Sequence, residues 1–420
     1  MHLEQLFPQL FILLLTSKLL TQLYLNKRQI FFVKAHSKNV PPEFEDQVTL
    51  EQHQKAASYT CSKTRFNSVN LLFEAIVLWL WITGGFLNQV DQWVRSYSEH
   101  YLVHGLLLFA VIGLISLLIN LPFQLYSTFV IEEKFGFNKM NAKIFITDLL
   151  KQIVLSAALL LPLLAGLLWV MQQLGENWWI WGWTLFVLFQ FLILLLYPNF
   201  IAPLFNQFSA LEDGELKKAI SQLLKKVEFK ASGLFVMDAS IRSSHGNAYF
   251  TGMGKTKRIV FFDTLIKKLS THQVIAVLAH ELGHFKHKHI LKSLILSLIF
   301  SLIAFAILGQ LYQNTAFFSG HGIASQSTAM ALLLFSWLAP LYTFFLTPLF
   351  SFLSRKNEFE ADEFAAKHSN AQDLIDALIC LYKENASTLT PDQLYTRFYH
   401  SHPPAKERIE FLKGINSLEP

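Results

Sequence analysis

The sequence contains 420 residues, of which 52% are hydrophobic and only 15% are charged. Soluble domains usually carry about a quarter charged residues, and the 39 Phe and 9 Trp add more apolar surface than a water-soluble fold of this size normally buries. The net charge of +5 comes from basic residues placed as membrane topology requires, so we expect no nucleic-acid partner. This composition excludes a disordered, collagen-like or disulfide-stapled chain and predicts a multi-pass membrane protein.

Seven apolar segments approach the roughly 20 residues that a helix needs to cross a bilayer core of about 30 Å. The first segment contains Lys18 and lacks both a basic start and a small-residue cleavage site, so we expect a retained helix rather than a signal peptide. Tryptophans gather at the start of the fifth segment, where an interfacial aromatic belt is expected. The predicted spans are Pro8–Leu25, Val69–Leu87, Leu102–Phe123, Gln152–Gln172, Trp178–Tyr197, Ile290–Tyr312 and Thr328–Leu353.

Basic residues are distributed unequally between the two sets of loops that connect these spans. One set contains 31 Lys and Arg residues, whereas the other contains only Arg95. By the positive-inside rule, we expect the N-terminus outside and the C-terminus in the cytosol. The polar segments that then share the cytosolic side are 26–68, 124–150, 198–289 and 354–420.

The polar segment 198–289 has the sequence pattern of a small α/β cap domain. An amphipathic helix is predicted over Leu211–Glu228, followed by short strands. The predicted strands are Gly233–Asp238, Ala248–Gly252 and Arg258–Phe262, with the last two joined across residues 253–255. The predicted organisation is five membrane helices with cytosolic loops in 1–197, the cap in 198–289, two membrane helices in 290–353 and cytosolic helices in 354–420.

A His-Glu-x-x-His motif follows the predicted strands. Ser270 and Gln273 form a capping-box signal, and the apolar run after them continues as a helix through His280 and His284. Residues four apart lie about 5–6 Å apart on one helix face, so both imidazoles can bind one ion. Zinc prefers such ligands, and Glu281 lies one step round the helix, where a general base can reach a water at the metal. The motif therefore predicts one zinc ion per chain.

A catalytic zinc also needs a third protein ligand and an open position. Candidates follow the seventh span, on the same predicted side of the membrane as the motif. Glu358 and Asp362 share one helix face, so Glu358 can bind zinc while Asp362 accepts the second N–H of a ligating histidine. Glu360 points elsewhere and is the weaker candidate ligand. A solvated acidic helix face is the alternative interpretation.

The remaining polar residues have simpler interpretations. We interpret His287 and His289 as part of a basic flank of the sixth span rather than as further ligands. Lys18, Glu74 and His104 lie inside spans and are expected to face protein or water. A seven-helix receptor with an accidental motif is an alternative class of protein. It would contain no zinc and would not require a carboxylate positioned to act with the two histidines.

Several runs of sequence also resemble a known family along nearly the whole chain. These runs are Leu25 to Gln29, Val40 to Pro42, Phe129 to Asn138, Tyr197 to Asn206, Asn247 to Phe250, His280 to His284, Ser354 to Asp362 and Ser401 to Pro404. Together they resemble the type I CAAX prenyl endopeptidases, integral-membrane zinc metalloproteases that include the yeast a-factor converting enzyme and the processor of prelamin A.

The resemblance implies a fold, an activity and a location. The expected fold is an all-α polytopic membrane protein with seven helices around a water-filled chamber, together with the small α/β metalloprotease cap. Family members remove the last three residues of prenylated Cys-a-a-X proteins, so the expected partners are peptide or protein substrates, prenylated or not, and membrane lipids. The expected location is the bacterial inner membrane or the endoplasmic reticulum membrane, with the zinc site toward the cytosol.

The resemblance also implies roles for individual residues. It makes His280, His284 and Glu358 the zinc ligands, Glu281 the general base, Asp362 the carboxylate behind a ligand, and Asn247 and His402 the groups that hold the substrate backbone or the developing oxyanion. Asn247 also begins a predicted strand to whose edge a peptide can add. The expected reaction is peptide hydrolysis, in which zinc polarises the carbonyl and Glu281 removes a proton from the zinc-bound water. A broader membrane quality-control protease without a prenyl requirement is the alternative enzyme.

Overall fold

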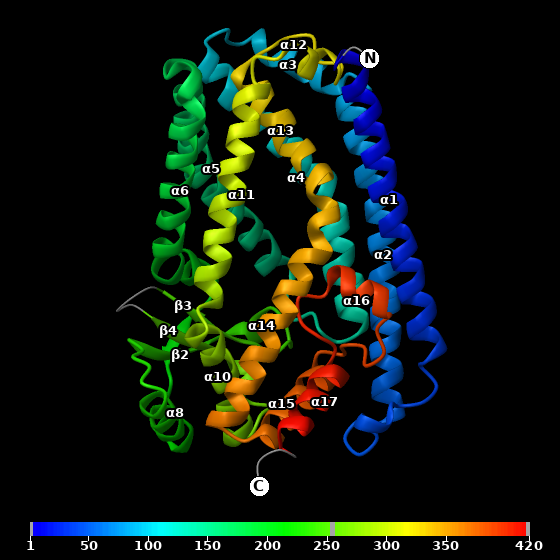
Figure 1. Cartoon of the computed structure of the whole chain (residues 1–420), viewed down its shortest axis with the longest axis vertical. Helices are drawn as coiled ribbons and strands as arrows, with labels where there is room; N and C mark the ends of the chain where they lie inside the picture. Colours follow the sequence, from blue (N-terminus) through cyan, green and yellow to red (C-terminus); the bar gives the residue numbers. More distant parts are fainter. Residues whose placement is uncertain (1–2, 253–256, 417–420) are drawn as a thin grey trace.

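The structure is a computed structural model that describes residues 3–252 and 257–416. Seven helices in this part of the chain are long and apolar enough to cross a membrane, which confirms the predicted number. They run roughly along the long axis of the molecule, and the two termini lie at its opposite ends (Figure 1). The seven segments are Glu4–Ala35, Leu50–Ile82, Tyr101–Glu132, Ala142–Gln173, Gly175–Phe205, His289–Leu311 and Thr328–His368.

The ends of the spans differ from the prediction, most clearly at the second one. The predicted range Val69–Leu87 is wrong at its C-terminal end because α2 ends at Ile82. Gly85 then adopts a φ of 77°, which favours glycine, and the separate helix α3 begins. At its other end α2 starts at Leu50, because the polar residues before the apolar run are helical as well. Hydropathy therefore predicts where a helix crosses the bilayer but not where it ends.

Helices account for most of the chain, and several short ones connect the spans or cover the cap. Their bounds are α1 Leu3–Ala35, α2 Leu50–Ile82, α3 Phe86–Arg95, α4 Tyr101–Tyr126, α5 Ala142–Gln173, α6 Trp178–Leu196, α7 Ala202–Phe205, α8 Glu215–Lys226, α9 Asp263–Ile266, α10 Thr271–Lys286, α11 His289–Leu311, α12 Thr315–Ser319, α13 Thr328–Thr343, α14 Thr347–His368, α15 Ala371–Glu384, α16 Gln393–Tyr399 and α17 Ala405–Asn416.

The cap contains one small mixed sheet, in which the strand order is β1-β2-β4-β3. The strands are β1 Phe208–Ala210, β2 Gly233–Met237, β3 Ala248–Thr251 and β4 Arg258–Phe262. β2 and β4 pair in parallel, and the other two pairings are antiparallel. The three predicted strands are confirmed to within a residue, whereas β1 is an additional strand. The predicted junction across 253–255 lies outside the described residues.

Two large hydrophobic cores lie at opposite ends of the molecule (Figure 1). One fills the cap and is built mainly from α8, β4, α10, α15 and α17. The other lies at the end that contains α3 and α12, and it extends into α4 and α13. The cap core matters for the site because α10 carries the His-Glu-x-x-His motif.

The start of α10 is fixed by the predicted capping box. The Ser270 side chain accepts a hydrogen bond from the Gln273 backbone N–H, and the Gln273 side chain accepts one from the Ser270 N–H. Val274, Leu278 and Leu282 then bury one face of the helix in the cap core. This packing fixes the rotation of α10 and hence the direction in which its histidines point.

α10 approaches α14 very closely at Gly283. A Cβ atom at this glycine would lie 2.9 Å from the Cα atom of Ala361 and 3.1 Å from its carbonyl oxygen. Ala361 is itself fully buried. The small residues on both sides let the two backbones meet, which brings the motif histidines beside the carboxylates of α14.

Candidate metal centre

The structure brings the three predicted ligands together between α10 and α14. The Nε2 atoms of His280 and His284 lie 3.2 Å apart. His284 Nε2 lies 3.3 Å from Glu358 Oε1, and His280 Nε2 lies 3.5 Å from Glu358 Oε2. Zinc bonds of about 2.0–2.1 Å in a tetrahedral arrangement would place neighbouring ligand atoms about 3.3 Å apart. The three side chains therefore have the spacing that one such ion requires.

The burial of this group favours a bound cation as well. Glu358 is only 2% exposed, and its Oε2 atom accepts no well-aligned hydrogen bond from the described residues. His402 Nδ1 and Arg408 Nη1 lie 2.8 Å and 3.7 Å from this oxygen, and a divalent cation would add to the positive charge that a buried carboxylate requires. Two imidazoles and one carboxylate are also a ligand set of catalytic zinc sites, which keep a fourth position open. These residues fit a divalent metal ion.

Asp362 lies behind the first ligand, as the sequence predicts. Its Oδ1 atom lies 2.8 Å from His280 Nδ1, and the carboxylate is completely buried. A proton held on Nδ1 leaves the lone pair of Nε2 free for a metal ion. Arg408 pairs with the same carboxylate through two hydrogen bonds, at 2.8 Å from Nε and 2.5 Å from Nη2. Arg408 therefore balances a second buried negative charge beside the ligands.

Sequence reasoning missed Arg408, although a signal was present. Residues Ala405, Arg408 and Leu412 share one face of α17, and all three are buried. A charged residue on the apolar face of an amphipathic helix needs a buried partner. The partner is Asp362 on α14, and the sequence does not predict that α17 packs against this helix.

The electrostatics of the group act on His280 in opposite directions. Burial lowers the pKa of His280, and the nearby Arg408 lowers it further, but the bonds to Asp362 and Glu358 outweigh both effects and raise the pKa to about 9. At neutral pH a cation therefore has to displace a proton from this imidazole.

Glu281 and His402 border the group in different ways. Glu281 is half-buried on α10 and forms no hydrogen bond or ion pair with another described residue. His402 belongs to the loop before α17, and its Nδ1 atom lies 2.8 Å from Glu358 Oε2 although 65% of its side chain is exposed. One free carboxylate and one exposed imidazole thus stand beside the candidate ligands.

Asn247 lies at the edge of the sheet rather than in contact with the ligands. It directly precedes β3, its Oδ1 atom accepts a hydrogen bond from the N–H of Ala248 at 2.8 Å, and its carbonyl accepts one from the N–H of Phe262 at 3.0 Å. β3 pairs with β4 alone among the described strands, so its other edge is open. Among the contacts of the described residues, none joins Asn247 to the three ligands.

His289 lies at the flank of the sixth span, as interpreted from the sequence, but it is buried and contacts the motif. It is the first residue of α11 and is only 4% exposed. Its Nδ1 atom lies 3.0 Å from His284 Nδ1, and its Nε2 atom lies 3.0 Å from Glu360 Oε2. The side chain of His287, in contrast, is 43% exposed and lies 3.9 Å from the same carboxylate oxygen. His289 thus lies at the flank of the sixth span, but the sequence does not predict that the turn between α10 and α11 folds its ring back onto the motif.

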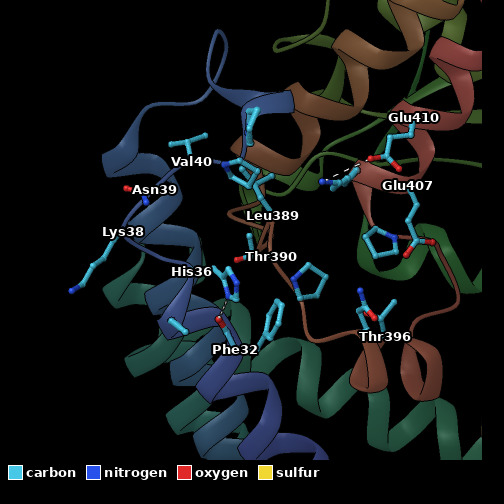
Figure 2. Close-up of a pocket in the computed structure, with 17 residues that line it drawn as sticks. Phe32, His36, Lys38, Asn39, Val40, Leu389, Thr390, Thr396, Glu407 and Glu410 are labelled. Atoms are coloured by element: carbon cyan, nitrogen blue, oxygen red, sulfur yellow. Dashed lines mark hydrogen bonds and ion pairs between the residues drawn. The ribbon is translucent and has the colours of Figure 1, made fainter.

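A cavity of about 600 Å³ lies near the end of α1 and the start of α17, and Figure 2 shows the side chains around it. Its lining combines the loop after α1, including Pro41 and Pro42, with Pro404 and Glu407 from the C-terminal segment. None of the candidate metal ligands lines it. The candidate metal centre is thus supported by the geometry of its donor atoms and not by this cavity.

Comparisons with known proteins agree with this geometry. Residues 29–207 match the family model described as "CAAX prenyl protease N-terminal, five membrane helices", and residues 210–416 match "Peptidase family M48". "CAAX prenyl protease 1" of Saccharomyces cerevisiae is 35% identical over 94% of this chain and 92% of its own length. "CAAX prenyl protease 1 homolog" of Arabidopsis thaliana is 34% identical over 93% and 94%.

A solved structure shows the same architecture. The crystal structure of S. mikatae Ste24p matches with a TM-score of 0.90 and 33% identity, over 97% of this chain and 98% of that one. These findings confirm the family resemblance and the fold class, and they favour a protease over a receptor. The chain therefore belongs to peptidase family M48 and is an integral membrane metalloprotease.

Proposed function

We propose that this chain is a zinc endopeptidase that cleaves Cys-a-a-X peptides near the C-terminus when the cysteine is prenylated. The names of its relatives suggest this substrate class. The observation that supports the chemistry most strongly is the separation of 3.2–3.5 Å between the ligand atoms of His280, His284 and Glu358. We assign these three side chains as the ligands of one zinc ion per chain.

In this proposal the residues around the ion divide the work of hydrolysis. Bound zinc would supply the positive charge that polarises the scissile carbonyl and favours deprotonation of the attacking water. Glu281 accepts the proton of that water and donates it to the leaving amine, since its carboxylate has no other partner among the described residues. Asp362 holds the proton of His280 on Nδ1 and so keeps the ring in its ligating form.

His402 and Asn247 are assigned to the substrate. The His402 Nδ1 atom faces Glu358, and with a proton on both ring nitrogens the exposed ring can donate from Nε2 to a peptide carbonyl or to the developing oxyanion. The side-chain amide of Asn247 donates no hydrogen bond to the described residues and stands at the start of the open edge of β3. A peptide that adds to this edge would meet the Asn247 amide as it enters.

The membrane assignment completes the proposal. With 31 basic residues in one set of loops, we place the cap and the metal centre on the cytosolic side. The membrane is the endoplasmic reticulum in a eukaryotic host and the inner membrane in a bacterial one. Proteolysis of sealed vesicles tests this placement, because sites in the cap should be cut only where the cytosolic face is outside.

The first test of the function is cleavage of matched peptides with and without a farnesyl group. The purified chain should cleave the farnesylated Cys-a-a-X peptide, lose activity with a chelator and recover it when zinc is added back. Equal cleavage of the unmodified peptide would instead support a quality-control protease without a prenyl requirement.

The second test separates catalysis from metal binding. Glu281→Gln should retain zinc and lose cleavage by about 10²–10⁴-fold, because an amide cannot accept the proton. Glu363→Gln on α14 is the matched control, since this residue only pairs with Lys367 at the surface. A Glu281→Gln enzyme with full activity would refute the assignment of the base.

A further inference from the structure

We propose that His289 and Glu360 form a hydrogen-bond relay that positions His284 for metal binding. This inference rests on the proposed metal site. The relay runs from His284 Nδ1 to His289 Nδ1 at 3.0 Å, and from His289 Nε2 to Glu360 Oε2 at 3.0 Å. It joins the end of α10, the start of α11 and the middle of α14.

The protons of the three side chains can be placed in only one consistent way. His284 points its Nε2 atom at the other two ligands, so as a neutral ligand it carries its proton on Nδ1. The acceptor in line with that proton is His289 Nδ1, which must itself be unprotonated. His289 then carries its proton on Nε2 and donates it to the carboxylate of Glu360. Each donor in the relay meets an acceptor.

The relay provides an acceptor for the Nδ1 proton of His284, as Asp362 does for the Nδ1 proton of His280. Asp362 accepts the Nδ1 proton of His280 at 2.8 Å. His284 has no carboxylate at its Nδ1 atom among the described residues, and His289 occupies that place. Glu360 thus acts on His284 through one intervening ring, as Asp362 acts on His280 without one.

The turn between α10 and α11 directs the ring of His289 toward His284. Lys288 adopts a left-handed conformation with a φ of 57°, which is uncommon for a residue other than glycine. This turn ends α10 and starts α11 at His289, whose ring lies edge-on to His284 with centroids 5.1 Å apart. Strained residues of this kind persist where the surroundings hold them, and the Lys288 N–H here donates a hydrogen bond to the Phe285 carbonyl at 3.0 Å.

A second metal ion is the competing interpretation of the same residues. Donor atoms of His287, His289 and Glu360 lie within 4.8 Å of one another. A metal ion on His289 Nε2, however, would leave the proton of a neutral ring on Nδ1. The two Nδ1 atoms lie 3.0 Å apart, so the Nδ1–H of His289 would then point at the Nδ1–H of His284, and two donors would meet without an acceptor. The relay therefore predicts one ion per chain rather than two.

The test measures zinc affinity of the purified full-length protein by competition with a chromophoric chelator. His289→Ala should weaken zinc binding by about 10–100-fold, the effect typical of residues that orient a metal ligand. His287→Ala is the matched control and should leave the affinity unchanged, since this exposed ring stacks on His289 but forms none of the hydrogen bonds of the relay. Thermal unfolding of each variant shows that it is folded.

The carboxylate provides a test that a merely structural role would not pass. Glu360→Ala should weaken zinc binding by about tenfold, because the proton on His289 Nε2 loses its acceptor. Glu360→Gln should stay within about threefold of the wild type, because its amide oxygen accepts the same proton. Rescue by the amide but not by alanine identifies hydrogen bonding as the cause.

The possible outcomes are distinct. Wild-type affinity in His289→Ala would overturn the relay, and so would equal affinities of Glu360→Ala and Glu360→Gln. Two zinc ions in the wild type and one in both His287→Ala and His289→Ala would replace the relay with a second metal site. If His289→Ala does not fold, the zinc affinities of Glu360→Ala and Glu360→Gln still test the relay, because the Glu360 side chain is partly exposed and its replacement should be tolerated. A wild-type protein without zinc would overturn the proposed function instead.

Discussion

Two buried clusters of the same residue types lie at opposite ends of this molecule. At one end, α3 and α4 bring together Asp91, Arg95 and His104. At the other end, α10, α14 and α17 bring together histidines, carboxylates and Arg408. Figure 1 shows α3 at the end opposite α10 and α17. The composition of the two clusters is similar, so their difference lies in which atoms face one another.

Around Asp91, several donors surround one acceptor. Arg95 Nε lies 2.7 Å from Asp91 Oδ2, the Ser325 hydroxyl donates to the same oxygen, and His104 Nε2 lies 2.9 Å from Oδ1. In the metal centre, three potential acceptor atoms converge on one point instead. The first arrangement holds the structure together without a ligand, whereas the second would be completed by a cation.

The largest effect is expected from removing an acceptor of the second cluster. Glu358→Gln should abolish stoichiometric zinc binding and reduce cleavage below detection, because one of the three proposed ligands is lost. Metal analysis of the purified chain measures this directly. Retention of one zinc ion per chain by this variant would break the comparison, since Glu358 would then have only a structural role.

Removing the acceptor of the first cluster should affect stability and not metal binding. Asp91→Ala leaves His104 buried and Arg95 partly buried without their partner, so we expect a loss of about 2–3 kcal/mol of unfolding free energy. Chemical denaturation in detergent measures this loss. The zinc content per folded chain should remain that of the wild type, and a drop in zinc would mean that the two ends are coupled.

An intermediate effect is expected for Asp362, the carboxylate that contacts both His280 and Arg408. Asp362→Asn still contacts His280 and Arg408 but no longer carries a charge, so zinc binding should weaken by about 10–100-fold. Chelator competition gives the affinity. An unchanged affinity would show that Asp362 only balances Arg408.

The smallest single step is expected in the pH dependence of metal affinity, at about tenfold for each pH unit. The pKa of His280 is raised to about 9, so this imidazole is protonated at neutral pH in the absence of a cation. Zinc binding should release this proton below pH 9, and the affinity should fall by about tenfold for each pH unit as the pH decreases. Titrations between pH 7 and 9 measure the slope. A flat profile would mean that the Nε2 atom of His280 is already free.

Much of the fold could be predicted from the sequence because its signals are local. Twenty consecutive apolar residues identify a span, and the pair Ser270 and Gln273 identifies the start of α10. The ends of the spans could not be predicted, because α2 continues into polar sequence at Leu50. The short strand β1 has only three residues, too few for a periodic pattern.

In the candidate site, too, local spacing predicts some residues, whereas tertiary packing positions the others. His280 and His284 are predictable because residues four apart share one helix face. Glu358 and Asp362 are predictable for the same reason. Arg408 and His289 reach the site from α17 and α11, and their contacts depend on packing rather than on any interval in the sequence. Apart from Asp362, the residues that support the candidate ligands are therefore harder to predict than the ligands.

The continuity of α14 with the preceding membrane helix has a further consequence. Glu358 stands on α14, which begins at Thr347 and belongs to the same apolar segment that starts at Thr328. Eleven residues of helix span about 17 Å, so a tilt of about 3° at Thr347 would move Glu358 by about 1 Å. Helices tilt to match the thickness of the surrounding lipid, and a displacement of about 1 Å can cost an enzyme about 10²-fold in rate. The acyl-chain length of the host membrane should therefore tune peptide cleavage by this protein.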